Sequence, residues 1–234
     1  MANDGGARPP RGPRERQRAA ILAAGPLGET GAARQAIAGS TMILAADGGA
    51  RHAATLGVEI DALVGDADSL AADELSSLLS HGVEIHSHSR DKDETDLELA
   101  VRLALEKGAT ELVILGALGR RWDHTFAALL LAADPALEGI GMRLVDGPQE
   151  ITILRGGSEL VIDEPAGTTV SLLPIGGTAG GITTRGLAYP LEAGELRLGS
   201  PRGVSNQVVS RPAGVRLVRG LLAVIVVRDA SLLA

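Results

Sequence analysis

Two aspartates that directly follow a short apolar run have the spacing of metal ligands. Asp66 and Asp68 stand two residues apart after the apolar residues 62–64. If the chain is still extended there, both side chains point to the same side. Two carboxylates on one side repel each other unless a cation lies between them, and hard oxygen ligands of this kind suit Mg²⁺. The alternative is that they only end a strand, since aspartate favours turns.

A second acidic position stands beside two glycines. Asp47 follows an apolar run and precedes Gly48 and Gly49. The glycines could form only a tight turn, or they could let a phosphate or a ring approach the backbone closely.

Residues 89–96 carry Asp93 and Asp96 just ahead of an amphipathic segment. Their spacing of three fits the N-cap and N3 positions of a helix, in a modified capping box. This role is compatible with Asp96 also facing a site.

The glycine-containing loop at residues 116–124 ends in Arg120, Arg121, Trp122, Asp123 and His124. An arginine in a glycine loop at a helix N-terminus is well placed to bind phosphate, although the pair could also be a solvated one. Asp123 is equally suited to cap the helix or to act as a ligand.

The elements that must position these residues alternate between strand and helix about five times over residues 19–141. This pattern predicts a doubly wound, mostly parallel α/β sheet. Right-handed crossovers bring the carboxyl ends of parallel strands to one edge. The acidic, glycine and arginine segments all follow strands, so we expect a pocket at that edge.

The pattern changes near residue 141. Short β-rich runs separated by glycine and proline follow, with 168–175 and 181–190 as two separate strands. They predict an all-β, sandwich or barrel-like domain over residues 142–234. Residues 1–18 are rich in arginine, proline and glycine without periodicity, which predicts a disordered tail.

Composition excludes several classes of protein. The formal net charge of −7 argues against nucleic-acid binding. No run is long and apolar enough to span a bilayer, so no membrane partner is expected. The absence of cysteine fits a cytoplasmic protein. With one Trp, one Tyr and one Phe, the core must consist of Leu, Val, Ile and Ala.

Together, these motifs resemble those of the thiamine pyrophosphokinase family in order and spacing. The matching segments are residues 46–50, 65–69, 91–96 and 116–124, with 184–191 and 203–206 resembling the family's substrate-side segments. The resemblance covers about residues 20–228. It implies Mg²⁺-dependent transfer of pyrophosphate from ATP to the thiamine hydroxyl, which releases AMP. Such a transferase, or kinase, serves thiamine diphosphate biosynthesis.

The resemblance also implies roles for the two domains and for single residues. Residues 19–141 would bind ATP and Mg²⁺, and residues 142–234 would bind thiamine and form a homodimer. The implied Mg²⁺ ligands are Asp66, Asp68 and Asp96, with Arg121 completing the catalytic set. The implied ATP and phosphate contacts are Asp47, Gly48, Gly49, Asp93, Thr95, Arg121, Asp123 and His124. The implied thiamine contacts are Tyr189, Ser205 and Asn206.

The site is expected to be shared between two chains. The N-terminal edge offers carboxylates and an arginine but almost no apolar surface for a ring. We therefore expect ring contacts from the β-rich half of a neighbouring subunit, in a two-fold dimer with composite sites.

Departures from the family pattern leave alternatives for the acceptor. Glu98 stands where the family usually has lysine, and Lys92 and Arg120 would restore positive charge near the phosphates. One alternative is a related diphosphokinase acting on a hydroxymethylpterin. Another is a non-catalytic thiamine or nucleotide sensor, although a complete set of metal ligands favours an enzyme.

Overall fold

The computed structural model describes residues 16–66, 68–89 and 91–228. The predicted tail at residues 1–18 lies outside the described residues except for its last three positions, of which Arg18 begins the first strand. Among the described residues, no helix is long and apolar enough to cross a membrane.

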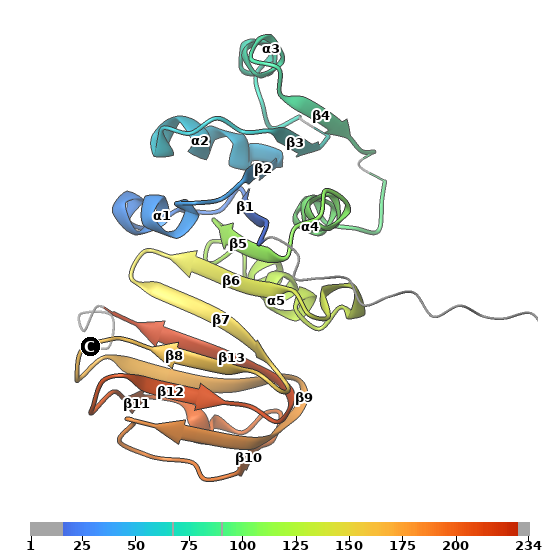
Figure 1. Cartoon of the computed structure of the whole chain (residues 1–234). Coiled ribbons are helices and arrows are strands. Elements are labelled where there is room, and N and C mark those ends of the chain that lie inside the picture. The colour runs from blue at the N-terminus through green and yellow to red at the C-terminus, as the bar shows by residue number, and fades with distance from the viewer. Residues whose placement is uncertain (1–15, 67, 90, 229–234) are drawn as a thin grey trace, which may run out of the picture.

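The first half of the chain is the predicted α/β arrangement (Figure 1). Its strands lie side by side in the order β4-β3-β2-β1-β5-β6, and every neighbouring pair is parallel. The strands are β1 (Arg18–Leu22), β2 (Met42–Ala46), β3 (Ala62–Gly65), β4 (Glu84–Ser87), β5 (Glu111–Leu115) and β6 (Gly141–Asp146). The helices are α1 (Thr30–Ile37), α2 (Arg51–Leu56), α3 (Ala72–Ser80), α4 (Asp96–Glu106) and α5 (Trp122–Leu131), with the 3₁₀ turns η1 (Asp47–Ala50) and η2 (Pro135–Leu137).

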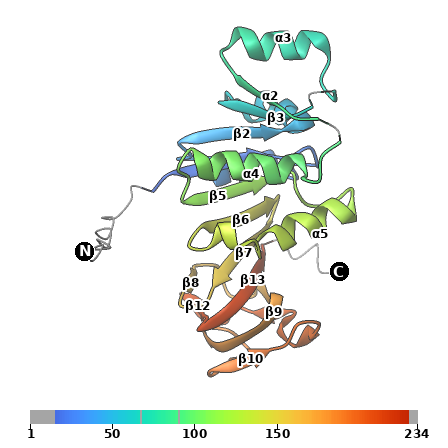
Figure 2. The ribbon, with the colours of Figure 1, turned by 90° about the vertical axis from the view of Figure 1, so that its right-hand side faces the viewer.

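Helices cover both faces of this parallel sheet, as a doubly wound fold requires. Residues of α4 and α5 share one apolar core with alternate residues of the strands. Residues of α1 and α2 form a second core on the opposite face. Figure 2 shows α4 and α5 together along one side of the strands. The central strands are buried on both faces, which explains why they read as nearly continuous apolar runs.

Helix ends follow local chemistry, with one correction to the expected caps. Gly57 closes α2 in the left-handed conformation, as its position after the helix predicts. The N-cap of α4 is Thr95, whose hydroxyl accepts a hydrogen bond from the Glu98 N–H at 3.2 Å. The expectation that Asp93 caps this helix is therefore wrong, because the helix begins only at Asp96. Instead of Asp93, Thr95 two residues later caps the helix through its side-chain oxygen.

The second half is antiparallel and mainly β, as expected. It contains β7 (Gln149–Arg155), β8 (Glu159–Ile162), β9 (Thr169–Arg185), β10 (Gly194–Leu196), η3 (Pro201–Gly203), β11 (Asn206–Gln207), β12 (Ala213–Arg216) and β13 (Arg219–Val227). Its strands enclose a separate aliphatic core that includes Leu172, Ile182 and Leu222.

The two strands expected at 168–175 and 181–190 are instead the single strand β9 of 17 residues. Its first part pairs with β13 and its last residues pair with β12. Gly176, Gly177 and Gly181 have positive φ values of 75°, 145° and 67°, which bend the strand between these partners without ending it. Glycine here acts as a bend and not as the end of a strand.

One sheet runs through both halves, because β6 pairs in parallel with β5 and antiparallel with β7. The change from parallel to antiparallel pairing therefore falls between β6 and β7, one strand after the expected domain boundary at residue 141. The boundary itself stays a prediction.

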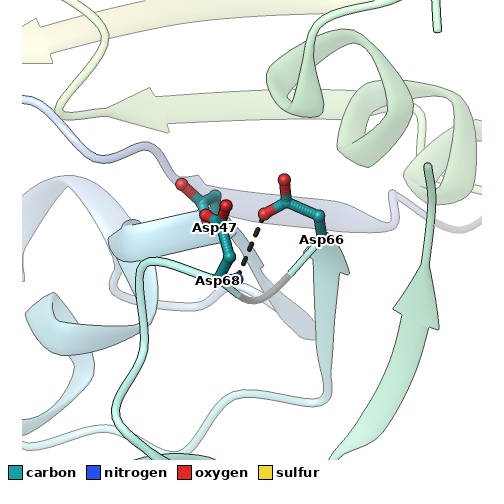
Figure 3. A group of neighbouring side chains, drawn as sticks. All are labelled: Asp47, Asp66 and Asp68. Carbon is teal, nitrogen blue, oxygen red and sulfur yellow. Dashed lines mark hydrogen bonds between the residues drawn. The ribbon is translucent and has the colours of Figure 1, made fainter. Parts of the chain in front are cut away.

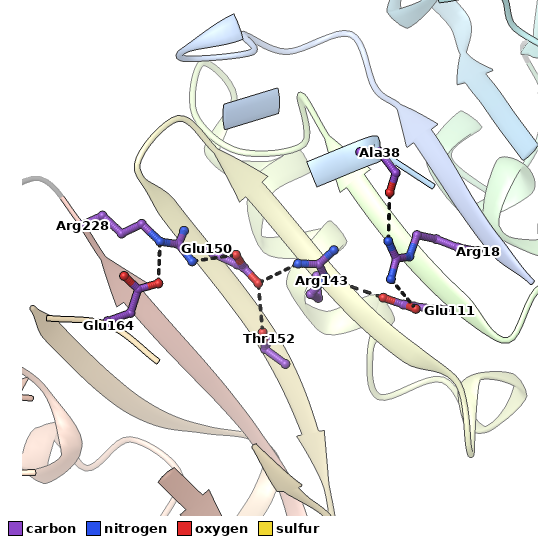
Figure 4. Close-up of polar contacts among 8 residues, drawn as sticks. All are labelled: Arg18, Ala38, Glu111, Arg143, Glu150, Thr152, Glu164 and Arg228. Atoms are coloured by element: carbon purple, nitrogen blue, oxygen red, sulfur yellow. Dashed lines mark hydrogen bonds and ion pairs between the residues drawn. The ribbon is translucent and has the colours of Figure 1, made fainter. Parts of the chain in front are cut away.

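Ion pairs also cross this junction (Figure 4). Glu150 on β7 accepts hydrogen bonds from Arg143 at 3.1 Å and from Arg228 at 3.0 Å. Burial of the Glu150 side chain opposes ionisation, but the two guanidinium groups outweigh it and hold the pKa of Glu150 below its ordinary value. The alternating series continues at both ends and comprises Arg18, Glu111, Arg143, Glu150, Arg228 and Glu164.

The aliphatic core predicted from composition is confirmed. Buried apolar side chains are almost entirely Leu, Ile, Val and Ala, with Met142 as an exception. All three aromatic side chains, Trp122, Phe126 and Tyr189, are exposed. Aromatic surface in this chain is therefore available to ligands or partners and takes no part in the core.

Candidate active site

Three carboxylates gather at the carboxyl ends of β2 and β3 (Figure 3). One oxygen from each of Asp47, Asp66 and Asp68 lies within 4.8 Å of the others. Asp66 follows the last residue of β3, and its Oδ1 accepts a hydrogen bond from the Asp68 N–H at 3.1 Å. Both side chains lie close to that of Asp47 on the neighbouring element. Three carboxylate groups so close together form a donor set suited to a hard divalent cation.

Asp47 is held in this cluster by unusual backbone geometry. Its φ is +48°, in the left-handed region that few residues other than glycine adopt. Its Oδ1 accepts a hydrogen bond from the Ser69 hydroxyl at 2.6 Å. Ser69 in turn lies on the loop that carries Asp68, so one hydrogen bond ties the two acidic segments together. Backbone strain of this kind is common at functional sites.

The glycines beside Asp47 have a packing role. A Cβ at Gly49 would lie 1.9 Å from the Leu22 carbonyl oxygen, so only glycine lets η1 pack against the end of β1. Gly48 is less crowded, because a Cβ there would lie 3.3 Å from the Ser69 hydroxyl. The sequence suggested that a phosphate or a ring could approach these glycines closely. At Gly49 the group that approaches closely is the protein's own backbone, at Leu22.

Asp96 lies beside the cluster but is not one of the three grouped carboxylates. A Cβ built on Gly65 would lie 3.2 Å from Asp96 Oδ1 and 3.3 Å from the Asp47 Cβ. Gly65 thus leaves the space that separates Asp96 from Asp47. The same oxygen, Asp96 Oδ1, accepts a hydrogen bond from the Lys92 ammonium.

A cavity of about 730 Å³ adjoins this acidic edge. Asp47, Thr95, Arg121 and His124 line it, while Asp93 and Asp123 lie outside its lining. One wall is apolar and comes from α4 and α5. The lining residues are Ala23, Ala24, Gly25, Asp47, Thr95, Leu97, Glu98, Gly116, Ala117, Gly119, Arg120, Arg121, His124, Ala127, Ala128, Leu130, Leu131, Asp134 and Pro135.

This apolar wall corrects one expectation from the sequence. The N-terminal half was expected to offer almost no apolar surface for a ring, yet Leu97, Ala128 and Leu131 line the cavity. The sequence pattern could not reveal this, because the same spacing also predicts the face of a helix that packs in the core. In the structure, residues of α4 and α5 face the cavity beside the loops that follow β1, β2 and β5.

Arg121 and Asp123 form an ion pair with each other at the mouth of the cavity. Arg121 donates through Nε to Asp123 Oδ1 at 3.1 Å and through Nη2 to Asp123 Oδ2. The pair holds the pKa of Asp123 below its usual value, with the hydrogen bond from Arg121 as the main cause. Asp123 therefore does not cap α5, whose N-cap residue is Arg121. The exposed guanidinium of Arg121 is turned toward this partner.

The residues predicted to contact thiamine gather in the second half of the chain. Asn206 is buried, and its side chain accepts a hydrogen bond from the Tyr189 N–H at 3.0 Å and donates one to the Tyr189 carbonyl at 2.7 Å. Asn206 thus holds the backbone that presents the exposed Tyr189 ring. Ser205 is exposed and has a φ of +61°. Its backbone N–H donates to the Ser171 hydroxyl at 3.0 Å.

Two contacts near the acidic cluster were missed from the sequence. Ser69 orients Asp47, and Arg51 on α2 donates hydrogen bonds to the Ser69 carbonyl and to Glu74. The hydrogen bond from Arg51 lowers the pKa of Glu74 to about 2. The position of Arg51, directly after the residue 47–50 turn, was the available signal, because a side chain there faces the same loop edge.

Two family models match this chain and cover both halves. The model described as "Thiamin pyrophosphokinase, catalytic domain" matches residues 33–143, and "Thiamin pyrophosphokinase, vitamin B1 binding domain" matches residues 158–222. The chain belongs to the thiamin pyrophosphokinase family and carries its catalytic and vitamin B1 binding domains, which is the family indicated by the sequence motifs.

Individual relatives agree with this family. The thiamine pyrophosphokinase of Bacillus subtilis (strain 168) is 28% identical over 161 residues, which cover 69% of this chain and 75% of that protein. Thiamine pyrophosphokinase 1 of Arabidopsis thaliana is 27% identical over 179 residues, which cover 74% of this chain and 67% of that protein. The crystal structure of the Bacillus subtilis enzyme matches with a TM-score of 0.79 at 26% identity and covers 91% of this chain and 100% of that chain.

Proposed function

We propose that this enzyme transfers the pyrophosphate group of ATP to the hydroxyl of thiamine and releases AMP, in a reaction that requires Mg²⁺. The observation that carries the proposal is the group of Asp47, Asp66 and Asp68 beside the cavity of about 730 Å³. A metal–nucleotide site needs both parts, namely carboxylates for the cation and a concave surface for the nucleotide.

The donor set supports a divalent metal site. Asp66 and Asp68 would hold Mg²⁺ together with Asp47, and Asp96 lies close enough to Gly65 to join them. Bound Mg²⁺ would neutralise the charge of the phosphates and orient the β-phosphorus toward the attacking hydroxyl. The chain's own contribution would be positional, because hydrogen bonds from the Ser69 hydroxyl to Asp47 and from the Asp68 N–H to Asp66 orient two of the carboxylates.

The cavity supports a nucleotide with its base and phosphates at different ends. Leu97, Ala128 and Leu131 offer an apolar wall for the base, and Asp47 with the metal would lie at the phosphate end. Arg121 would leave Asp123 to bind phosphate, since its pair is exposed and therefore weakly stabilising. His124 and Thr95 also line the cavity, whereas Asp93 and Asp123 do not.

Thiamine would bind where two subunits meet. Tyr189 lies between β9 and β10, and Ser205 directly precedes Asn206, the first residue of β11. Strands β10 and β11 lie at the opposite end of the molecule from β2 and β3 (Figure 1). One chain therefore does not bring its own Tyr189 to its own acidic cluster. A two-fold dimer would bring Tyr189 of one subunit to the acidic cluster of the other, and the exposed ring would then stack on thiamine.

The experiment that tests the proposed reaction compares acceptors. AMP release from ATP is measured with Mg²⁺ and either thiamine or 6-hydroxymethylpterin at equal concentrations. The proposal expects AMP only with thiamine, with thiamine diphosphate formed in equal amount. AMP release with the pterin but not with thiamine would show that the acceptor is a hydroxymethylpterin. Binding of thiamine without release of AMP would identify a sensor.

A further inference from the structure

Lys92 forms an ion pair inside the edge of the candidate site. Its ammonium donates a hydrogen bond to Asp96 Oδ1, and its side chain is only 16% exposed. Lysine is rare in this chain, and the other one, Lys107, pairs with Glu84 at 2.8 Å with twice that exposure, at 34%. A lysine withdrawn from water beside a carboxylate loses hydration, so its position requires the favourable charge of Asp96.

The Asp96 oxygen that accepts the hydrogen bond from Lys92 lies next to Gly65. Asp96 Oδ1 would lie 3.2 Å from a Cβ on Gly65, the residue directly before Asp66. The ammonium therefore stands at the border of a site with four carboxylates. Asp96 accepts its hydrogen bond from the Lys92 ammonium, and the carboxylates of Asp47, Asp66 and Asp68 converge next to it.

Two arginines near this edge have acidic partners outside the candidate metal ligands. Arg51 donates to Glu74 and to the Ser69 carbonyl, and Arg121 donates to Asp123. Lys92 differs from these arginines because its partner, Asp96, is one of the carboxylates proposed to bind the metal. Lysine also differs from arginine in having a compact charge on a flexible four-carbon stem, which can reach a new partner without a fixed fork geometry.

An ammonium and a divalent cation compete for the same carboxylate oxygen. If Asp96 becomes a ligand of the metal, Lys92 loses its partner while phosphate oxygens arrive beside it. A phosphate oxygen is a strong acceptor for an ammonium, so exchange of one partner for the other keeps the lysine paired.

We propose that Lys92 neutralises Asp96 until a divalent cation binds that carboxylate, and that the released ammonium then binds a phosphate oxygen of the nucleotide. The proposal deepens the proposed function and rests on it, because it requires a metal–nucleotide complex at this site. It makes Lys92 a phosphate-binding residue whose availability depends on the metal.

Two binding measurements without thiamine test this exchange. Mn²⁺ affinity is measured in the absence of nucleotide from the electron paramagnetic resonance signal of free Mn²⁺. Affinity for α,β-methylene-ATP, in which the bond to be broken is blocked, is measured by calorimetry at saturating Mg²⁺. The variants are Lys92→Gln and Lys92→Met, the latter keeping an unbranched apolar stem if glutamine impairs folding. Lys107→Gln is the matched control, since it also removes a lysine paired with an acid.

The proposal expects effects of opposite sign. Loss of Lys92 should tighten Mn²⁺ binding by about three- to tenfold, because the competitor is gone, and weaken binding of the ATP analogue by about tenfold. Lys107→Gln should change neither affinity by more than about twofold.

Unchanged Mn²⁺ affinity in folded Lys92 variants would overturn the proposed exchange, because Lys92 and the metal would then not compete for Asp96. Unchanged or tighter binding of the ATP analogue would overturn it too, because Lys92 would then only neutralise charge. Failure of the thiamine reaction would contradict the proposed function but would leave both binding results standing.

Discussion

At the scale of single residues, the proposed chemistry depends on the carboxylates at the strand ends. Asp66 and Asp68 lie together as their spacing predicts, and Asp47 joins them from the neighbouring element. The sequence indicated Asp47 as a nucleotide contact, and its place beside the metal candidates depends on a positive φ and on Ser69. Neither could be predicted, because aspartate before two glycines is compatible with many turns.

Replacement of one carboxylate tests the metal site. Asp68→Asn removes a charged oxygen ligand but keeps the size of the side chain, so the fold should survive. Since metal charge stabilisation supplies several kcal/mol, turnover should fall roughly 10³-fold at limiting Mg²⁺.

Steady-state rates over a range of Mg²⁺ concentrations measure the effect, and circular dichroism reports folding. Asp73→Asn, an exposed aspartate in the first turn of α3, is the control and should keep full activity. Normal turnover of Asp68→Asn at limiting Mg²⁺ would remove Asp68 from the metal site.

At the scale of helices and strands, the elements of the first half agree closely with those predicted from the sequence, because the patterns that predict them are strong. The short, mostly apolar run at 111–115 has the length and composition of a buried parallel strand and forms one, and Gly57 ends α2 where a left-handed residue is needed. The second half was harder to predict. Its glycines bend β9, and only pairing with β12 and β13, both far along the chain, shows that the strand continues.

The ion pairs of Glu150 connect β7 to Arg143 on β6 and to Arg228 directly after β13, so they should stabilise the junction between the halves (Figure 4). Glu150→Gln leaves Arg143 and Arg228 without this charged acceptor. We expect a loss of about 1.5–3 kcal/mol in the free energy of unfolding at pH 7. Glu195→Gln, in a more exposed pair with Arg219, should cost at most about 1 kcal/mol.

The effect of Glu150 should depend on pH with a definite sign. Because folding lowers the pKa of this carboxyl from its ordinary value of 4.5, the stabilisation is present above pH 4.5 and is lost as pH falls through the folded pKa. The difference in free energy of unfolding between wild type and Glu150→Gln should therefore become smaller as the pH falls below 4.5. Urea unfolding at several pH values measures it, and a difference that stays constant into acid would contradict the role of the charge.

At the scale of the whole molecule, the two halves share one continuous sheet, which places the acidic cluster and the Tyr189 loop at opposite ends (Figure 1). The sequence predicted both architectures but not their fusion through β6, because a strand does not reveal whether its second neighbour will be parallel or antiparallel. The predicted dimer stays a prediction, and this separation supports it.

Mixed dimers test the composite site. Asp68→Asn impairs the phosphate side, and the double change Tyr189→Ala and Ser205→Ala impairs the thiamine side without touching the buried Asn206. In a mixed dimer one site carries both lesions and the other is wild type. Equal mixing makes half of the dimers mixed, so activity should return to about one quarter of the wild-type value. No recovery after demonstrated subunit exchange would place the whole pocket within one chain.

The nature of the transferred group is the most direct test of the proposed reaction. Phosphorus NMR of the enzyme with ATP, Mg²⁺ and thiamine resolves every phosphorus-containing product in one spectrum. Attack of the thiamine hydroxyl on the β-phosphorus predicts AMP and thiamine diphosphate in equal amounts, with no ADP. Stoichiometric ADP with thiamine monophosphate would show attack on the γ-phosphorus and would contradict pyrophosphate transfer.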